Sequence, residues 1–184
     1  ETERVLGERL VSTLQVVARD VKIQVAFNTA TVRSYRQIGY ENREIRDEDF
    51  RNDAVDGGEV GSGQGVTAFF DIEPIPGAAG TLGDVHLRYK PARLEQGERA
   101  REIAVPMAQA SAGTFEDASR DFRFGAVVAE TALQLRQSPY AGSVSLDELR
   151  GLAAASARPE VADDADLATV LSLASEALKP RGGE

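Results

Sequence analysis

Apolar side chains recur at every second position in five short runs before Ala110. In the first run, Val21, Ile23 and Val25 alternate with Lys22, Gln24 and Ala26, a pattern typical of a strand with one face in water. The other runs have the same period, and they cover residues 32–41, 66–73, 82–90 and 101–107. No stretch of helical period separates the runs, so we expect neighbouring strands to pair antiparallel.

After Ala110 the apolar pattern changes to a helical period. Segment 119–137 is apolar around most of its circumference, which predicts a helix that is buried on more than one side and closes the sheet. Ser145 and Glu148 form an S-x-x-E capping box that starts a second helix, and leucines at helical spacing from Leu167 indicate a third. The predicted fold class is therefore α+β: an antiparallel β-sandwich or curled sheet followed by three C-terminal helices.

The charge of the chain excludes several classes of partner. The formal net charge is −9 over 184 residues, and the acidic residues are spread along the whole chain. Such a field repels phosphate backbones and anionic lipid, so we expect no nucleic-acid binding. No apolar run approaches the roughly 20 residues of a membrane span, so no direct membrane insertion is expected. The absence of cysteine excludes disulfides and thiolate metal sites.

The stretch 39–65 combines carboxylates with glycines, as a calcium loop or a phosphate-binding loop would. With Gly57 at the sixth position of an EF-hand loop, Ala54 and Gly63 fall where ligands are required. The later glycines precede a strand instead of opening a helix, contrary to a phosphate-binding loop. We interpret the stretch as a surface connection with a helical turn at 46–51, and we predict no metal and no cofactor.

Two other features have simple structural interpretations. His86 is the only histidine and alternates outward on its predicted strand, so an exposed strand histidine is expected instead of a zinc ligand. Ser119 is placed to cap the 119–137 helix, with Asp121 at the positive end of the helix dipole.

A more specific group of residues ends the second predicted strand. Tyr35 and Tyr40 lie beside Glu41, Asn42 and Arg43, and tyrosine hydroxyls with an arginine fork can form a structural network that fixes a loop. We expect the Arg43 side chain to be at least half buried, bonded to carboxylates or carbonyls of the 46–60 loop. The acidic residues that complete this possible structural network or interaction site are Glu48, Asp49 and Asp53. No residue is assigned a catalytic role.

Two alternative functions stay open. A hydrolase could use carboxylates of the 46–60 loop such as Asp49, Asp53 and Glu59, but it needs two carboxylates about 5 to 9.5 Å apart and one raised pKa. A carbohydrate-binding sandwich normally presents an exposed aromatic platform. With no Trp and four Tyr, the chain offers little material for one.

Several segments resemble the C-terminal region of YfbK-like bacterial proteins. They are DVKIQVAFN (Asp20 to Asn28), YRQIGYENR (Tyr35 to Arg43), DGGEVGSGQGVTA (Asp56 to Ala68) and DFRFGAVVAE (Asp121 to Glu130). The resemblance runs in the same order from Val11 to Gly142. It implies a domain of unknown function, without an established catalytic set, that follows a von Willebrand factor type A domain.

The apolar periodicity and the resemblance together predict three regions. Residues 1–18 would be the terminal helix and link from a missing type A domain, 19–110 an antiparallel β region, and 111–184 a helical region packed on it. The implied function is a non-catalytic accessory, protein-interaction or structural module in the bacterial cell envelope. Its implied partners are its own type A domain and an unknown protein.

Overall fold

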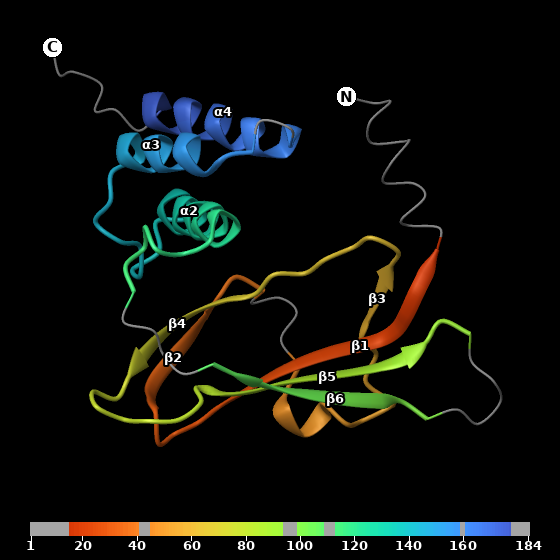
Figure 1. Cartoon of the computed structure of the whole chain (residues 1–184). Coiled ribbons are helices and arrows are strands. Elements are labelled where there is room, and N and C mark those ends of the chain that lie inside the picture. Colours follow the sequence, from red (N-terminus) through yellow and green to blue (C-terminus); the bar gives the residue numbers. More distant parts are fainter. Residues whose placement is uncertain (1–14, 41–44, 94–98, 109–112, 159–160, 178–184) are drawn as a thin grey trace, which may run out of the picture. The chain divides into compact units, whose positions relative to one another are not determined.

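The computed structural model describes residues 15–40, 45–93, 99–108, 113–158 and 161–177. The chain divides into two compact units, residues 1–110 and 111–184, which we describe separately as the β unit and the helical unit (Figure 1). The predicted fold class is confirmed, because antiparallel sheets are followed by three helices. The packing of the helical region on the β region stays a prediction.

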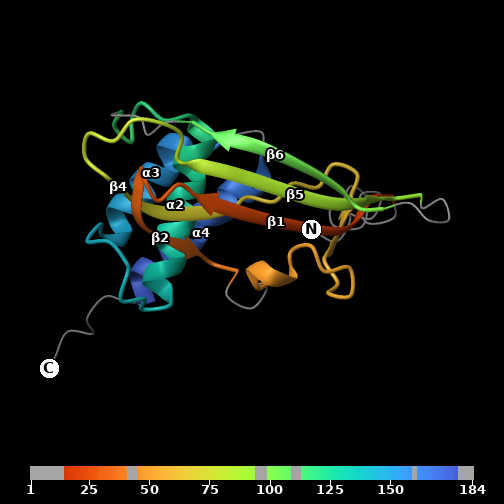
Figure 2. The same ribbon diagram turned by 90° about the horizontal axis from the view of Figure 1, so that it is seen from below.

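The strands of the β unit form two antiparallel sheets. In chain order they are β1 (Val16–Phe27), β2 (Val32–Ile38), β3 (Gly58–Gly61), β4 (Phe69–Pro74), β5 (Gly83–Pro91) and β6 (Arg101–Met107). In the described part of the chain, one sheet has the order β3-β1-β5-β6 and the other pairs β2 with β4. Figure 2 shows β1, β5 and β6 side by side.

Each of the five predicted strands is present, whereas β3 was not predicted from the sequence. Its four residues, Gly58 to Gly61, contain two glycines and lie inside the stretch that we interpreted as a surface connection. Pairing with β1 forms this strand, with Gly58 opposite Val21 and Gly61 opposite Val16. The same pairing corrects the predicted terminal helix, because residues 16–18 belong to β1. Residues 1–14 of that predicted helix lie outside the described residues.

Residues 46–57, which we call the cover segment, include the short 3-10 helix η1 (Asp47–Asp49), so the predicted helical turn is confirmed. Phe50 at the end of this turn is buried. In Figure 1, η1 lies below the four-stranded sheet.

The two faces of the four-stranded sheet differ from the expected pattern. Lys22 was expected on a wet face, but its side chain is almost completely buried. Ile23, its apolar neighbour, is instead about half exposed. The expectation fails because the cover segment supplies hydrogen-bond acceptors for the polar face, which the alternation within one strand cannot reveal.

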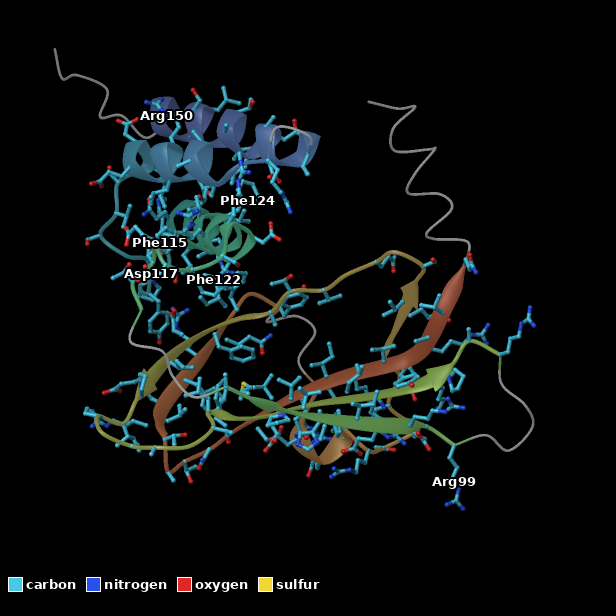
Figure 3. The ribbon with its side chains drawn as sticks, in the orientation of Figure 1. Arg99, Phe115, Asp117, Phe122, Phe124 and Arg150 are labelled. Carbon is cyan, nitrogen blue, oxygen red and sulfur yellow. The ribbon has the colours of Figure 1, made fainter. Side chains whose placement is uncertain are left out.

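The helical unit contains α2 (Arg120–Leu135), α3 (Leu146–Ser156) and α4 (Ala162–Ala177). Both predicted starts are confirmed: Ser119 accepts from the Phe122 N–H, and Ser145 and Glu148 form a reciprocal capping box. The core consists of aliphatic side chains, against which Phe115 packs (Figure 3). Its buried members are Val127, Leu149, Ala153 and Leu171.

Helix α2 leaves several large apolar side chains exposed within the helical unit. Phe122 is 52% exposed, and Val128 and Leu135 are 40% and 45% exposed. Within the helical unit these three side chains are therefore not covered, and the expected burial of this helix against the sheet stays a prediction. Helix α2 contacts α3 and α4, and Val127 of α2 belongs to the buried core.

Candidate functional site: a charged cluster beneath the cover segment

Five charged side chains hold the cover segment on the four-stranded sheet. They come from β1, β5 and the segment itself, and we call them the charged cluster: Asp20, Lys22, Asp53, Arg88 and Lys90. The Lys22 Nζ donates to the carbonyl oxygen of Asn52 at 2.7 Å and lies 3.3 Å from Asp20 Oδ1. The Gly57 N–H donates to the same Asp20 oxygen at 2.9 Å. Asn52 and Gly57, in the C-terminal half of the cover segment, are thus hydrogen-bonded to side chains of β1.

Strand β5 supplies the remaining cations of the cluster. The Arg88 Nη2 donates to Asp53 Oδ1 at 2.7 Å. The Lys90 Nζ lies 2.8 Å from Asp20 Oδ2 and 3.6 Å from Asp53 Oδ1. The buried Nη1 of Arg88 has no hydrogen-bond partner among the described residues. Lys90 therefore joins a carboxylate of the sheet to a carboxylate of the cover segment.

A bulge in β1 directs Asp20 into the cluster. The pairing of β1 with β5 shifts between Arg19 and Lys22, and Asp20 has a φ of 49°. Aspartate tolerates this left-handed conformation better than most residues, and a bulge re-aims side chains at such a point. The local break in the strand thus lets Asp20 and Lys22 share hydrogen-bond partners.

A second set of contacts fixes the other part of the cover segment. Arg51 makes two hydrogen bonds to Glu102 on β6, at 2.9 and 2.7 Å. The His86 Nδ1 lies 3.3 Å from Glu102, and the Phe50 ring lies edge-on to the imidazole, with centroids 6.3 Å apart. His86 is therefore partly covered, and the expectation of an exposed strand histidine is corrected. Gln24 also donates to Asp47, at 2.8 Å.

These contacts keep the charged groups ionised. Burial raises the pKa of Asp20, but hydrogen bonds from Lys90, Lys22 and the Gly57 amide outweigh it and leave the pKa below its ordinary value. The hydrogen bond from Arg88 lowers the pKa of Asp53, and the bond to Asp20 raises the pKa of Lys90. Neither shift moves its group toward neutral pH, where a general acid or base would need it.

The structure describes two tyrosines of the predicted network. Tyr35 on β2 is 59% exposed, and its ring packs against Phe27 with centroids 4.3 Å apart. Tyr40 is also exposed and has a φ of 63°. Glu41, Asn42 and Arg43 lie outside the described residues, so their network and the burial of Arg43 stay predictions.

The three predicted acidic residues have different surroundings. Glu48 forms an exposed ion pair with Arg46 at 2.8 Å. Asp49 accepts from Asn52 at 3.1 Å and pairs with Arg46 at 3.0 Å, all within the cover segment. Asp53 alone of the three is shown bonded to cations of the sheet.

Sequence reasoning did not select Asp20, Lys22, Arg88 or Lys90. Charged residues at alternate positions of a strand normally indicate a solvated face. The sequence of β1 or β5 alone therefore does not show that these charged side chains are covered. A usable signal lies in the comparison of segments: cations on one face of β1 and β5 match the acidic residues of the 46–59 stretch.

Other acidic residues are engaged in helix starts. Asp117, labelled in Figure 3, accepts from the amide and hydroxyl of Thr114 at 2.8 and 3.0 Å. Asp121 accepts from Arg158 at 2.9 Å, and the same arginine binds the buried Asp164. Within the described ranges, no three His, Asp or Glu side chains are grouped as metal ligands. The described helices are each too short or too polar to cross a membrane.

Comparison with known proteins identifies the family of this chain. The model of the family "Uncharacterized protein YfbK, C-terminal" matches residues 12–80 and 77–177. The uncharacterized protein YfbK of Escherichia coli (strain K12) is 34% identical over 165 residues, which cover 82% of this chain and 28% of that protein. No solved structure matches the chain. The chain therefore belongs to the YfbK C-terminal domain family.

Proposed function

We propose that this chain is a non-catalytic accessory module of a bacterial von Willebrand factor type A domain protein of the cell envelope. It acts by contact with its own type A domain or with another protein. The observation that carries the proposal is the use of the charged cluster: Asp53 binds Arg88, and Lys22 binds the backbone of Asn52. These groups hold one segment of chain on a sheet, which is a structural task.

The alternative hydrolase gains little support from the described carboxylates. Such an enzyme needs one carboxyl group with a raised pKa beside one that stays ionised. The hydrogen bond from Asn52 and the bonds from Arg46 lower the pKa of Asp49, as Arg88 does for Asp53. Both shifts favour the ionised form, which suits an ion pair better than a proton donor.

Direct binding tests the proposal. The chain is titrated by calorimetry with the separately produced type A domain of the longer protein, and the mixture is cross-linked with a short amine-reactive reagent. We expect saturable binding with a dissociation constant on the order of micromolar, the range of ordinary transient interfaces. The exposed pair Arg46 and Glu48, changed together to Gln, serves as a surface-charge control. No heat and no specific cross-link at about 100 times that concentration would contradict contact with the type A domain.

A separate assay addresses catalysis. The unmodified chain and the Asp49→Asn and Asp53→Asn variants are compared on chromogenic ester, phosphate and glycoside substrates. We expect equal background rates from all three proteins. A rate that both substitutions abolish would favour the hydrolase.

A further inference from the structure

The cover segment ends in an aspartate followed by a glycine, Asp56 and Gly57. This is the one Asp–Gly sequence in the chain, and no Asn–Gly sequence occurs. At such a pair the glycine nitrogen can attack the carboxyl group of the aspartate before it, because glycine has no side chain to obstruct the approach. Asp56–Gly57 is therefore the peptide bond of this chain that is chemically most prone to rearrange.

Contacts with β1, all inside the β unit, fix Gly57 in place. Its N–H donates to Asp20 Oδ1 at 2.9 Å. A Cβ atom at Gly57 would lie 2.7 Å from the carbonyl oxygen of Val21 and 2.8 Å from the carbonyl carbon of Asp20, so the main chain approaches β1 as closely as glycine permits. The next residue, Gly58, pairs with Val21 in the ladder of β1 and β3. The Gly57 nitrogen therefore cannot turn toward the Asp56 carboxyl group while the cover segment is closed.

We propose that Asp56–Gly57 is a site of spontaneous isoaspartate formation, which the charged cluster blocks through Asp20 and which holds the cover segment open once it has occurred. After the bond from Gly57 to Asp20 opens, the Gly57 nitrogen attacks the carbon of the protonated Asp56 carboxyl group. The new C–N bond forms, the C–OH bond breaks, and the hydroxyl leaves as water with the amide proton. Water then adds to the ring at the main-chain carbonyl carbon of Asp56 and breaks its bond to the nitrogen, so that this carbon becomes the free carboxyl group.

The product has a longer main chain, which now runs through the former side chain of Asp56. The added carbon lengthens the cover segment by about 1.5 Å. The segment is bonded to β1 on both sides of this point, by Lys22 at Asn52 and by Asp20 at Gly57, and Gly57 has no room to move closer to β1. At least one of the two bonds is therefore lost in the product. The reaction consumes and releases only water, so it holds whether or not this chain contacts a type A domain.

Ageing in neutral buffer measures how strongly the fold blocks the reaction. The intact chain and a synthetic peptide of residues 51–60 are incubated side by side. Isoaspartate is counted by methyl transfer with an isoaspartyl methyltransferase and located by peptide mapping. We expect the intact chain to react at least about tenfold more slowly than the peptide, because only molecules with an open cover segment react. Asp56→Glu keeps the charge but would have to close a six-membered ring, so it should give no signal at this position.

Two substitutions at position 20 test the part played by Asp20. Asp20→Gly tolerates the φ of 49° but offers no acceptor to the Gly57 N–H, whereas Asp20→Asn keeps an oxygen that can accept. We expect Asp20→Gly to react about tenfold or more faster than the unmodified chain, as for the loss of a hydrogen bond to a charged group, and Asp20→Asn to react more slowly than Asp20→Gly. Leu149→Met, in the helical unit, should leave the rate unchanged. Should Asp20→Gly fail to fold, the unmodified chain in urea below its unfolding transition repeats the test, and its rate should rise with urea.

Hydrogen exchange tests the effect of the product on the cover segment. The chain is aged in urea until part of the molecules carry isoaspartate, and it is then refolded. Amides of the cover segment should exchange fast in the modified molecules and slowly in the others. Equal protection in both populations would reject the effect on the cover segment.

Three other results would overturn the inference. Equal rates in the intact chain and the peptide would show that the fold does not block the reaction. Equal rates in Asp20→Gly and the unmodified chain would show that Asp20 does not hold Gly57. Isoaspartate that forms to the same extent in Asp56→Glu would place the reactive site elsewhere in the chain.

Discussion

The two units of the chain bury different proportions of apolar and charged side chains. In the helical unit the largest fully buried side chains are Leu149, Leu171, Val127 and one charged residue, Asp164, whereas in the β unit the largest is Lys22. The helical unit is therefore stabilised mainly by apolar burial, and the part of the β unit beneath the cover segment by paired charges. A buried charge needs its partners in place, so the β unit depends more on individual contacts.

This difference has a consequence for tolerance to mutation. An aliphatic core accepts similar volumes at modest cost, but removal of one member of a buried charged group leaves the others without compensation. We therefore expect conservative changes to separate the two units clearly. Hydrogen exchange followed by mass spectrometry can report each unit within the intact chain.

The largest effect is expected for Lys22→Met. Methionine keeps most of the volume of lysine, but it cannot donate to the Asn52 carbonyl or pair with Asp20. Loss of one partner from a buried charged group costs about 3 to 5 kcal/mol. Urea melts should show this loss, and exchange should increase in β1 and the cover segment while α3 keeps its protection. A loss below about 1 kcal/mol would mean that Lys22 is hydrated in solution and that the comparison between the units fails.

The next effect is expected for Leu149→Ala in the helical unit. Leu149 is 2% exposed and contacts an aliphatic cluster with Val127 and Leu171, so its truncation should cost about 3 kcal/mol. Leu149→Met, which nearly conserves volume, should cost less than about 1.5 kcal/mol. Leu149→Met should therefore be tolerated whereas Lys22→Met should not, and this pair of variants tests the difference between the two units most directly.

Phe122→Ala is the exposed control for the same unit. Because about half of its side chain is exposed, truncation should cost only about 1 kcal/mol. A cost close to that of Leu149→Ala would show that Phe122 is covered in solution.

The sequence predicted the helical unit better than the β unit for a physical reason. Ser119, Ser145 and Glu148 act on backbone groups within three residues of themselves, so a local pattern identifies them. The position of Lys22 depends on Asn52, thirty residues away. Alternation identified β1 and its two faces, but it could not show which face the chain covers. Strand β3 was missed for the same reason, since its pairing with β1 overrides the low strand propensity of its glycines.

Acid should weaken the charged cluster in a defined direction. The pKa of Asp20 is lowered in the folded state, so its ionised form stabilises the fold above its unfolded pKa, about 3.9. That contribution is lost as the pH falls through the lower folded pKa. Stability of the β unit should therefore decline below about pH 4, and Asp20→Asn should flatten this decline. The hydrogen bond from Arg158 lowers the pKa of Asp164, so the stability of the helical unit should also decline in acid. Because Asp20→Asn leaves Asp164 unchanged, the acid dependence of the helical unit serves as the internal reference in this variant.

Hydrogen exchange of the β unit that keeps its acid dependence in Asp20→Asn would show that other carboxylates of this unit cause it. The first candidate is Asp53, whose pKa Arg88 lowers. Asp53→Asn, measured over the same pH range, separates the two carboxylates of the cluster.

The smallest effect is expected from divalent cations, although the β unit is rich in acid. Its cluster carboxylates are already compensated by protein cations: Asp20 by Lys22 and Lys90, and Asp53 by Arg88. A cation would have to displace these groups, and it would gain few oxygen ligands, since Ca²⁺ takes six to eight. Binding to the folded state alone would raise stability by about 2.7 kcal/mol at a hundredfold excess over the dissociation constant. We therefore expect melts in EDTA, magnesium and calcium at fixed ionic strength to coincide. A rise of several degrees with millimolar calcium, lost in Asp53→Asn, would mean that an ion can replace the protein's own cations in the cluster.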